Sequence, residues 1–301
     1  MMFRAALVCA GIALAPLAFG GPRIAVIQSD ELSPYTLPVE AFVNEFDEAV
    51  TVINIKGRYP NGQAAAKRLM EDPPDIFFCL GAKAAFVMRD FFPKVPMVFA
   101  SVLTPARYGI TGRRVAGIST TVSPAATVSQ FASFFEKTKK IGILRGPSIS
   151  DGRIEEMRKA AAKSGIELVV ERARSPKNTM KIFHSMSNQV DAIWLQSDRE
   201  IITPKVFRRL ADACRTRQIP MIVESESMVR AGALFAVTPK PDGLGQQAAE
   251  MVKDILNGTS PADLGLQTAE QANVVLNMRT VRTAKLPFDP FLLDFVDITI
   301  D

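Results

Sequence analysis

Between Lys140 and Val237 the chain alternates short apolar runs with segments of helical periodicity. The apolar runs are Ile141–Leu144, Leu168–Val170, Ala192–Leu195, Met221–Val223 and Ala233–Val237. Runs this short and this apolar are typical of strands buried on both faces, as in a parallel sheet between two helical layers. The sequence therefore predicts an α/β domain whose ligand contacts follow the strands, since the ends of parallel strands border a crevice.

The same alternation comes earlier, and its apolar runs are Ile24–Ile27, Val52–Ile55, Asp75–Leu80 and Pro96–Ala100. Two similar halves in tandem predict two lobes with a cleft between them. We assign 21–119 to the first lobe, joined by about 239–272, and 120–238 to the second lobe, joined by about 273–301. The segments 260–272 and 286–301 lack clear periodicity, which predicts a surface connection and an irregular tail.

Two dipeptides predict helix starts, because each places a capping hydroxyl directly before a proline. They are Ser123-Pro124 and Thr203-Pro204. After the second, apolar residues recur at helical spacing from Val206 to Cys214 and leave the charged residues for solvent. Such a stripe indicates core packing.

The N-terminal residues 1–20 have the composition of a signal peptide. Arg4 is their single charge, Ala5–Leu17 is almost wholly apolar, and Ala18 and Gly20 are small residues at the positions that a signal peptidase reads. The apolar stretch is short for a membrane span. We therefore expect an exported, periplasmic protein that begins near Gly21, with a retained membrane anchor as the alternative.

The cysteines and the charged residues indicate buried thiols and a solvated surface. Of the cysteines beyond the signal region, Cys79 falls in a predicted strand and Cys214 in a predicted helix, and both are expected to be buried thiols. The 36 basic and 31 acidic residues are spread along the chain, so the net charge of +5 indicates a solvated surface. We expect no nucleic acid partner.

Catalytic signals are scarce. His184 is the single histidine, and it lies in a segment of helical periodicity, where it is expected to be a packing or surface residue. No Cys/His spacing fits zinc, and no nucleophile elbow or phosphate-binding loop occurs. Gly243-Leu244-Gly245 opens a helix but does not directly follow a strand. The sequence thus favours a protein that is not an enzyme and has no metal or cofactor.

Polar and small residues follow the predicted strands, where a cleft would orient a small polar ligand. The candidate ligand-binding residues are Ser29, Gly81, Ala82, Ser101 and Thr104 in the first lobe, and Arg145, Ser148, Asp198, Arg199, Glu224 and Ser225 in the second lobe. Ordinary loops are polar as well, so no single residue of this set indicates a binding site. The hypothesis of a ligand site rests on the convergence of these residues at the strand ends.

Several longer fragments resemble a known family. They are Pro96–Val102, Asp191–Trp194, Ile219–Met221, Val229–Leu234, Gly245–Val252, Ile255–Gly258 and Pro261–Asp263. In order and content they resemble the ABC-transporter substrate-binding proteins, the family that includes tryptophan- and phenylalanine-binding members. The resemblance implies a type I periplasmic-binding-protein fold, with two Rossmann-like lobes, parallel sheets and a hinge. It further implies an ABC permease of the inner membrane as partner, an amino acid or related carboxylate as ligand, and a monomer.

Arginines near one retained aspartate distinguish the chain from the family pattern. Asp198 matches that pattern and would accept hydrogen bonds from a ligand ammonium group. Arg145 either clamps a ligand carboxylate or pairs with Asp198 and fills the space. The first option predicts an anionic or zwitterionic ligand, and the second predicts a pocket that has lost its ancestral specificity.

Two other functions stay open at this point. The same fold serves ligand-sensing accessory proteins of membrane receptors or sensor kinases. An exported enzyme acting on a small metabolite would instead depend on Asp198 or Glu224.

Overall fold

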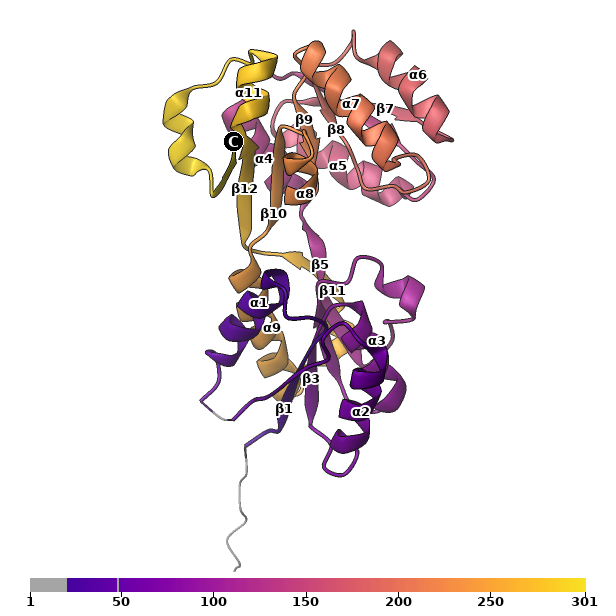
Figure 1. The fold of residues 1–301 in the computed structure, drawn as a ribbon, viewed down its shortest axis with the longest axis vertical. Coiled ribbons are helices and arrows are strands. Elements are labelled where there is room, and N and C mark those ends of the chain that lie inside the picture. Colours follow the sequence, from indigo (N-terminus) through magenta and orange to yellow (C-terminus); the bar gives the residue numbers. More distant parts are fainter. Residues whose placement is uncertain (1–20, 48) are drawn as a thin grey trace, which may run out of the picture.

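Two separate β-sheets organise the molecule (Figure 1). The computed structural model describes residues 21–47 and 49–301, so the expected signal peptide lies outside the described residues. Within that part of the chain, one sheet has six strands in the order β11-β5-β4-β3-β1-β2. The other has seven strands in the order β13-β12-β10-β9-β8-β6-β7. We call the two bodies built on these sheets the first and the second lobe.

The first lobe is a parallel sheet with helices on both faces. Its strands are β1 (Ile24–Gln28), β2 (Thr51–Asn54), β3 (Ile76–Leu80), β4 (Met97–Ala100), β5 (Val115–Val122) and β11 (Leu266–Ala269). Its helical segments are α1 (Ser33–Val43), α2 (Tyr59–Leu69), α3 (Ala82–Phe91), η1 (Pro105–Tyr108), α9 (Pro241–Leu256) and α10 (Pro261–Leu264). Strands β1, β3 and β4 are buried throughout, as their uninterrupted apolar runs predict.

The second lobe repeats this plan with one exception. Its strands are β6 (Lys140–Arg145), β7 (Glu167–Arg172), β8 (Ala192–Trp194), β9 (Met221–Val223), β10 (Phe235–Pro239), β12 (Ala272–Asn277) and β13 (Ile298–Ile300). Its helical segments are α4 (Pro124–Phe134), α5 (Asp151–Lys163), α6 (Pro176–Met186), α7 (Pro204–Thr216), α8 (Glu226–Arg230), α11 (Met278–Ala284) and η2 (Pro290–Phe295). The exception is β12, which runs antiparallel to β10 and makes the sheet mixed.

The chain passes between the two sheets three times within the described residues. It does so from β5 to α4, from β10 to α9 and from β11 to β12. In Figure 1 these connections lie together at the middle of the molecule, with the first lobe below and the second lobe above. Because β5 runs upward out of the first sheet and β10 runs downward out of the second, the carboxyl ends of both sets of parallel strands face this middle region.

The predicted caps and core stripe are confirmed. Ser123 Oγ accepts a hydrogen bond from the backbone N–H of Ala126 at 3.2 Å, and Thr203 Oγ1 accepts one from Val206 at 3.3 Å. The apolar stripe of α7, which includes Cys214, is buried against the second sheet. Local sequence therefore determines where these helices begin and which face they bury.

Two expectations were wrong because short edge strands leave little trace in a sequence. The segment 260–272, expected to be a surface connection, contains α10 and β11, and β11 pairs with β5 in parallel. The tail after Lys285, expected to be irregular, contains η2 and β13, which pairs in parallel with β12. Strands of three or four residues at a sheet edge have one exposed side and lack the apolar run of a central strand.

Glycine in α9 has a packing role. A Cβ on Gly245 would overlap the carbonyl oxygen of Pro38 and would lie 2.9 Å from the backbone nitrogen of Phe42, both in α1. Gly245 thus allows α9 to pack closely on α1 across one face of the first sheet. This contact gives Gly245 a packing role, so the sequence Gly243-Leu244-Gly245 needs no nucleotide-binding role to explain it.

The cysteines are free, buried thiols, as expected. Burial raises the pKa of Cys214 to about 12, against a smaller opposing effect of Arg217, and raises the pKa of Cys79 further. Across 21–47 and 49–301 no helix combines the length and apolar character that crossing a bilayer requires.

Candidate functional site

The strand-end loops of the first lobe bring three candidate residues together. Ser29 follows β1 and is buried, and its Oγ accepts a hydrogen bond from the backbone N–H of Ala84 at 3.1 Å. Gly81, which follows β3, has φ +85°, and a Cβ there would lie 2.6 Å from Ser29 Oγ and 2.9 Å from the ring of Tyr35. Ala82 then begins α3. This arrangement places the N-terminal end of α3 at the loop after β3. The backbone N–H groups at such a helix end attract negative charge.

The loop after β4 joins the same region. The backbone N–H of Gly81 donates to the carbonyl of Ala100 at 2.9 Å, which places Ser101 beside the Gly81 turn. Ser101 has φ +58°, a left-handed conformation that non-glycine residues seldom adopt and that often marks a functional turn. Thr104 directly precedes η1, and its side chain is exposed to solvent.

In the second lobe Asp198 connects two loops. It is 2% exposed, and its Oδ2 accepts the backbone N–H of Ser148 while its Oδ1 accepts that of Glu200, both at 2.9 Å. A Cβ on Gly146 would overlap Oδ2, so the glycine makes room for the carboxylate. The loops after β6 and β8 are thus held together by one buried negative charge.

Arg145 does not reach Asp198 in this structure. Its Nε donates to the carbonyl of Ile149 at 3.0 Å, and its Nη1 pairs with the exposed Asp151 at 2.5 Å. The hydrogen bond and the charge of Arg145 hold the pKa of Asp151 below its usual value. Of the two alternatives for Arg145, the structure therefore does not show the one in which it pairs with Asp198. Arg199, the other arginine of the expected site, is exposed.

Glu224 is held by neutral donors at the end of β9. Its Oε2 accepts the backbone N–H of Ser197 at 2.8 Å. With its amide oriented to satisfy both neighbours, Gln196 donates to Glu224 Oε1 at 3.1 Å and accepts from Trp194 Nε1 at 2.9 Å. Ser225 caps α8 by accepting the N–H of Met228 at 3.4 Å. Glu224 thus has a defined orientation, whereas Ser225 is engaged in the helix start.

A small hollow lies beside Glu224, and we call it the inner hollow. It is lined by Thr121, Val122, Thr127, Arg153, Trp194, Val223, Glu224 and Val237. These residues come from the end of β5, from the first turns of α4 and α5, from the carboxyl ends of β8 and β9, and from the middle of β10. Sequence reasoning missed Arg153, because one arginine on a helix with many charges carries no distinguishing signal.

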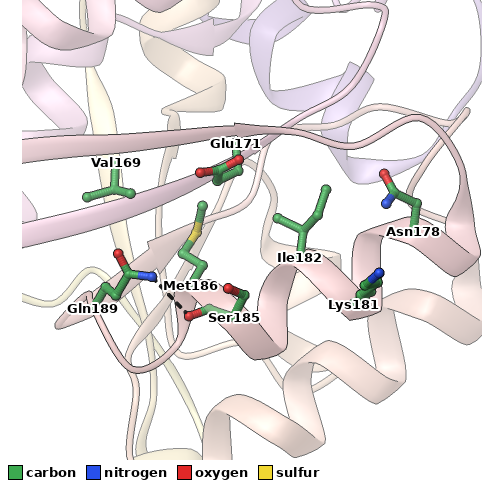
Figure 2. Close-up of a pocket in the computed structure, with 8 residues that line it drawn as sticks. All are labelled: Val169, Glu171, Asn178, Lys181, Ile182, Ser185, Met186 and Gln189. Atoms are coloured by element: carbon green, nitrogen blue, oxygen red, sulfur yellow. Dashed lines mark hydrogen bonds between the residues drawn. The ribbon is translucent and has the colours of Figure 1, made fainter.

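Two larger hollows of the second lobe lie away from this region. One, shown in Figure 2, lies between β7 and α6, and its lining includes Glu171, Lys181 and Met186. The other, of about 750 Å3, lies at the amino ends of the strands, beside Thr138, Asp191 and the tail segment at Phe288. Each is confined to one lobe, so closure of the lobes would enclose no ligand in either. Ligands of open α/β sheets bind at the carboxyl ends.

Residues that could hold a metal do not converge in the part of the chain that the structure describes, where no group of three or more His, Cys, Asp or Glu side chains comes together. His184 is exposed on α6, and its Nδ1 lies 2.6 Å from the carbonyl oxygen of Met180 in the preceding turn. The strand-end loops offer hydrogen-bonding groups and charges, among them the Ser29 hydroxyl and the carboxylate of Glu224.

Comparison with known proteins gives a matching family model and a related protein. A model of the family described as ABC transporter substrate binding protein matches residues 49–289. A tyrosine-binding protein from Clostridioides difficile (strain R20291) is 22% identical over 237 residues, covering 76% of this chain and 68% of the relative.

Solved structures show the same fold. The ligand-free, open structure of a substrate binding protein with adhesive properties from Clostridium difficile matches with a TM-score of 0.70 at 19% identity, covering 93% of this chain and 99% of that one. An ABC domain from Streptococcus pneumonia in complex with L-Trp matches with a TM-score of 0.56 at 20% identity, covering 93% and 100%. The predicted α/β fold with two Rossmann-like lobes is confirmed as the type I periplasmic-binding-protein fold.

Proposed function

Because this chain belongs to the ABC transporter substrate-binding protein family, we propose that it is an exported protein that captures an amino acid or related carboxylate. The ligand binds between the lobes, and the loaded protein delivers it to an ABC permease of the inner membrane. Membership of this family overturns the enzyme hypothesis, since the family's members bind their substrates without transforming them. No observation favours the sensory role over transport.

The facing strand ends are the observation that supports this proposal. The loops after β1, β3 and β4 in the first lobe and after β6, β8 and β9 in the second lobe border the same middle region. We place the ligand contacts on these loops and on the residues that border them, which together include all eleven residues proposed from the sequence. A ligand that contacts both sets of loops favours the closed arrangement of the lobes, and the permease recognises that arrangement.

The two lobes make different contributions. The first offers the N-terminal end of α3 and the Ser29 hydroxyl beside Gly81, a region suited to a polar or anionic group. The second offers loops ordered by Asp198 and the oriented carboxylate of Glu224. In this proposal Asp198 orders the loops after β6 and β8 around the ligand, because both of its oxygens already accept backbone N–H groups.

A thermal-shift screen of the purified exported protein tests the proposal. Proteinogenic amino acids, small carboxylates and short peptides are compared with a neutral sugar as the non-binding control. A cognate ligand at about 100 times its dissociation constant adds about 2.7 kcal/mol to the free energy of unfolding. The same ligand should shrink the radius of gyration in small-angle scattering, because the lobes close. A screen in which no amino acid or carboxylate raises the melting temperature contradicts the proposal.

A further inference from the structure

The larger hollow at the amino ends of the second sheet has the size of a ligand site, and we call it the outer hollow. It is lined mainly by residues 133–138, 190–191, 217–220 and 286–289, and its volume is about 750 Å3. Ligand pockets in proteins typically measure about 300 to 1,000 Å3. The first three of these segments lead into β6, β8 and β9, so the outer hollow lies at the end of the sheet opposite to the proposed amino acid site.

The wall of the outer hollow is apolar and aromatic. Phe134 and Phe135, at the C-terminal end of α4, are buried. Ile219 and Leu286 are buried beside them on other segments of the lining. The ring of Phe134 stacks on that of Phe288 in the tail, with the ring centroids 6.4 Å apart. A molecule that enters here removes apolar surface from water, which favours an occupant with an apolar body.

The tail that forms one side of the hollow is held at both ends. The backbone N–H of Leu286 donates to the carbonyl of Val281 at 3.1 Å, and that of Asp297 donates to the carbonyl of Val274 at 3.0 Å. Between these points the chain arches outward beside β12 (Figure 1, yellow). The wall is therefore a fixed part of the second lobe.

Thr138 adds a buried hydroxyl that lacks a partner. The residue lies between α4 and β6 and is 7% exposed. In the described part of the chain no group hydrogen-bonds with its Oγ1, although every fully enclosed side-chain nitrogen or oxygen there has a partner. The Thr138 oxygen is therefore reached from the hollow that the residue lines, and it is available to a ligand.

The carboxylates beside the hollow are largely matched already. Asp191 Oδ2 accepts the backbone N–H groups of Lys139 and Lys140, both at 2.8 Å. Asp289 Oδ1 accepts the backbone N–H two residues further on, at 3.0 Å. The remaining carboxylate of the lining, Glu136, is exposed and directly precedes a lysine that also lines the hollow, so these two charges roughly cancel.

Arg217 leaves an unmatched positive charge at the edge of the hollow. Its Nη1 donates to the side-chain oxygen of Asn188 at 3.1 Å, and no salt bridge among the described residues includes Arg217. A guanidinium group has five N–H donors, so most of them remain available for an anionic group. The charge of Arg217 and the apolar wall together complement a molecule that is anionic at one end and apolar at the other.

We propose that the outer hollow binds an amphiphile that joins an apolar chain or ring system to one anionic head group, as a fatty acid does. The apolar body packs against the phenylalanine wall, and Arg217 binds the head group. The occupant is a free molecule, because a bilayer surface cannot reach a recessed wall of buried side chains. This inference does not rest on the proposed function, since the hollow lies outside the cleft between the lobes.

Calorimetric titration of the purified protein with matched probes tests the inference. The probes are dodecanoate below its micelle concentration, dodecyltrimethylammonium with the same chain and the opposite charge, and acetate as the head group alone. Wild-type protein should bind dodecanoate at a single site, at least about tenfold more tightly than the cationic amphiphile and about a hundredfold more tightly than acetate. Equal affinities for the two amphiphiles would mean nonspecific partitioning and would overturn the inference.

A charge variant assigns the head group to its residue. Arg217→Gln should weaken dodecanoate binding by about tenfold and should not weaken binding of the cationic amphiphile, because the variant removes only the positive charge. Arg215→Gln, at an exposed position of α7 outside the hollow, is the matched control and should bind as wild type. Dodecanoate binding that is unchanged in Arg217→Gln contradicts the assignment.

A filling variant tests the location. Ser133 is exposed at the end of α4 and lines the hollow, so the indole of Ser133→Trp should occupy the space without removing a core side chain. Dodecanoate should then bind at least about tenfold more weakly. Gln130→Trp, one turn earlier on α4 and outside the hollow, should bind as wild type.

Two further outcomes would overturn the inference. Dodecanoate binding that survives Ser133→Trp would place the site elsewhere. Co-sedimentation of wild-type protein with phosphatidylglycerol vesicles that Ser133→Trp abolishes would assign the hollow to a membrane surface. The probe comparison on wild-type protein and the Arg217→Gln titration decide the matter even if Ser133→Trp does not fold.

Discussion

The carboxylate of Asp198 accepts the backbone N–H of Ser148 at 2.9 Å, although the two residues are 50 positions apart in the sequence. Its second oxygen accepts the N–H of Glu200, and the side chain is buried. The residue that the sequence assigned to a ligand ammonium group therefore orders the loops after β6 and β8. In the proposed function, Asp198 contributes to binding through that structural role.

Asp198→Ala should destabilise the ligand-free protein and weaken ligand binding together. Two backbone N–H groups would lose a charged acceptor in a buried setting, which costs about 2 to 4 kcal/mol of unfolding free energy. Thermal or denaturant unfolding without ligand measures this loss. Asp212→Asn, an exposed residue paired with Arg215 on α7, is the control and should have little effect. A ligand-free variant as stable as wild type would show that Asp198 does not order the loops.

Gly146→Ala should perturb the same loops from the other side. The added methyl group would overlap Asp198 Oδ2, and the resulting displacement should cost about 1 to 3 kcal/mol. Gly152→Ala is the matched control, since the nearest atom to its Cβ is Ser150 Oγ at 3.9 Å. That control lies in α5 and should stabilise the protein by about 0.5 kcal/mol. Equal melting temperatures for the two variants would argue against the crowding at Gly146.

Gly245→Ala should weaken the packing of α9 on α1. A Cβ would overlap the Pro38 carbonyl, which belongs to the backbone and cannot turn aside as a side chain can. We expect a loss of about 1 to 3 kcal/mol. Glu250→Ala, at an exposed position of the same helix, should change stability by less than about 0.5 kcal/mol. Hydrogen exchange should locate the faster opening in α1 and α9, and uniform exchange rates would refute this prediction.

The buried thiols should make stability fall at alkaline pH. Burial raises the pKa of Cys214 to about 12 from an ordinary value near 9, so the folded protein keeps a proton that the unfolded chain releases. Below about pH 9 the thiol is protonated in both states and the stabilisation is fully present. Between about pH 9 and 12 the free energy of unfolding should fall by up to about 1.4 kcal/mol per pH unit for this thiol.

Unfolding measured from pH 8 to pH 10 checks that slope. Cys214→Ala should show a shallower decline than wild type, with Cys79 contributing in the same direction in both proteins. Native protein at pH 8 should also react with a thiol reagent far more slowly than unfolded protein, because both cysteines are buried. Identical slopes in the two proteins would contradict the assignment.

The fold followed from local patterns because burial determines the sequence of its central elements. Strands such as β3 are buried on both faces and therefore read as continuous apolar runs, and Ser123 and Thr203 mark helix starts through a capping bond within three residues. The family resemblance rests instead on the content and order of specific fragments between Pro96 and Asp263. The short strands β11 and β13 were not predicted, because they lie at sheet edges with one side exposed and lack a continuous apolar run.

The candidate site was predicted at the level of loops. Strand ends identify which loops face the middle region, because parallel strands share one carboxyl edge. They do not say where each side chain points. Arg145 pairs with Asp151 of the same lobe. Arg153, a residue without any sequence signal, lines the inner hollow instead.

The sequence alone thus determined the two α/β lobes, the positions of the central strands and the edge of each sheet on which we propose the ligand site, since these depend on periodicity within a few residues. The tertiary structure alone decided that Asp198 orders two loops and that Arg153 and Glu224 line one hollow. Such pairings join residues far apart in the chain. They depend on how the elements pack and on the direction of each side chain, which no local pattern encodes.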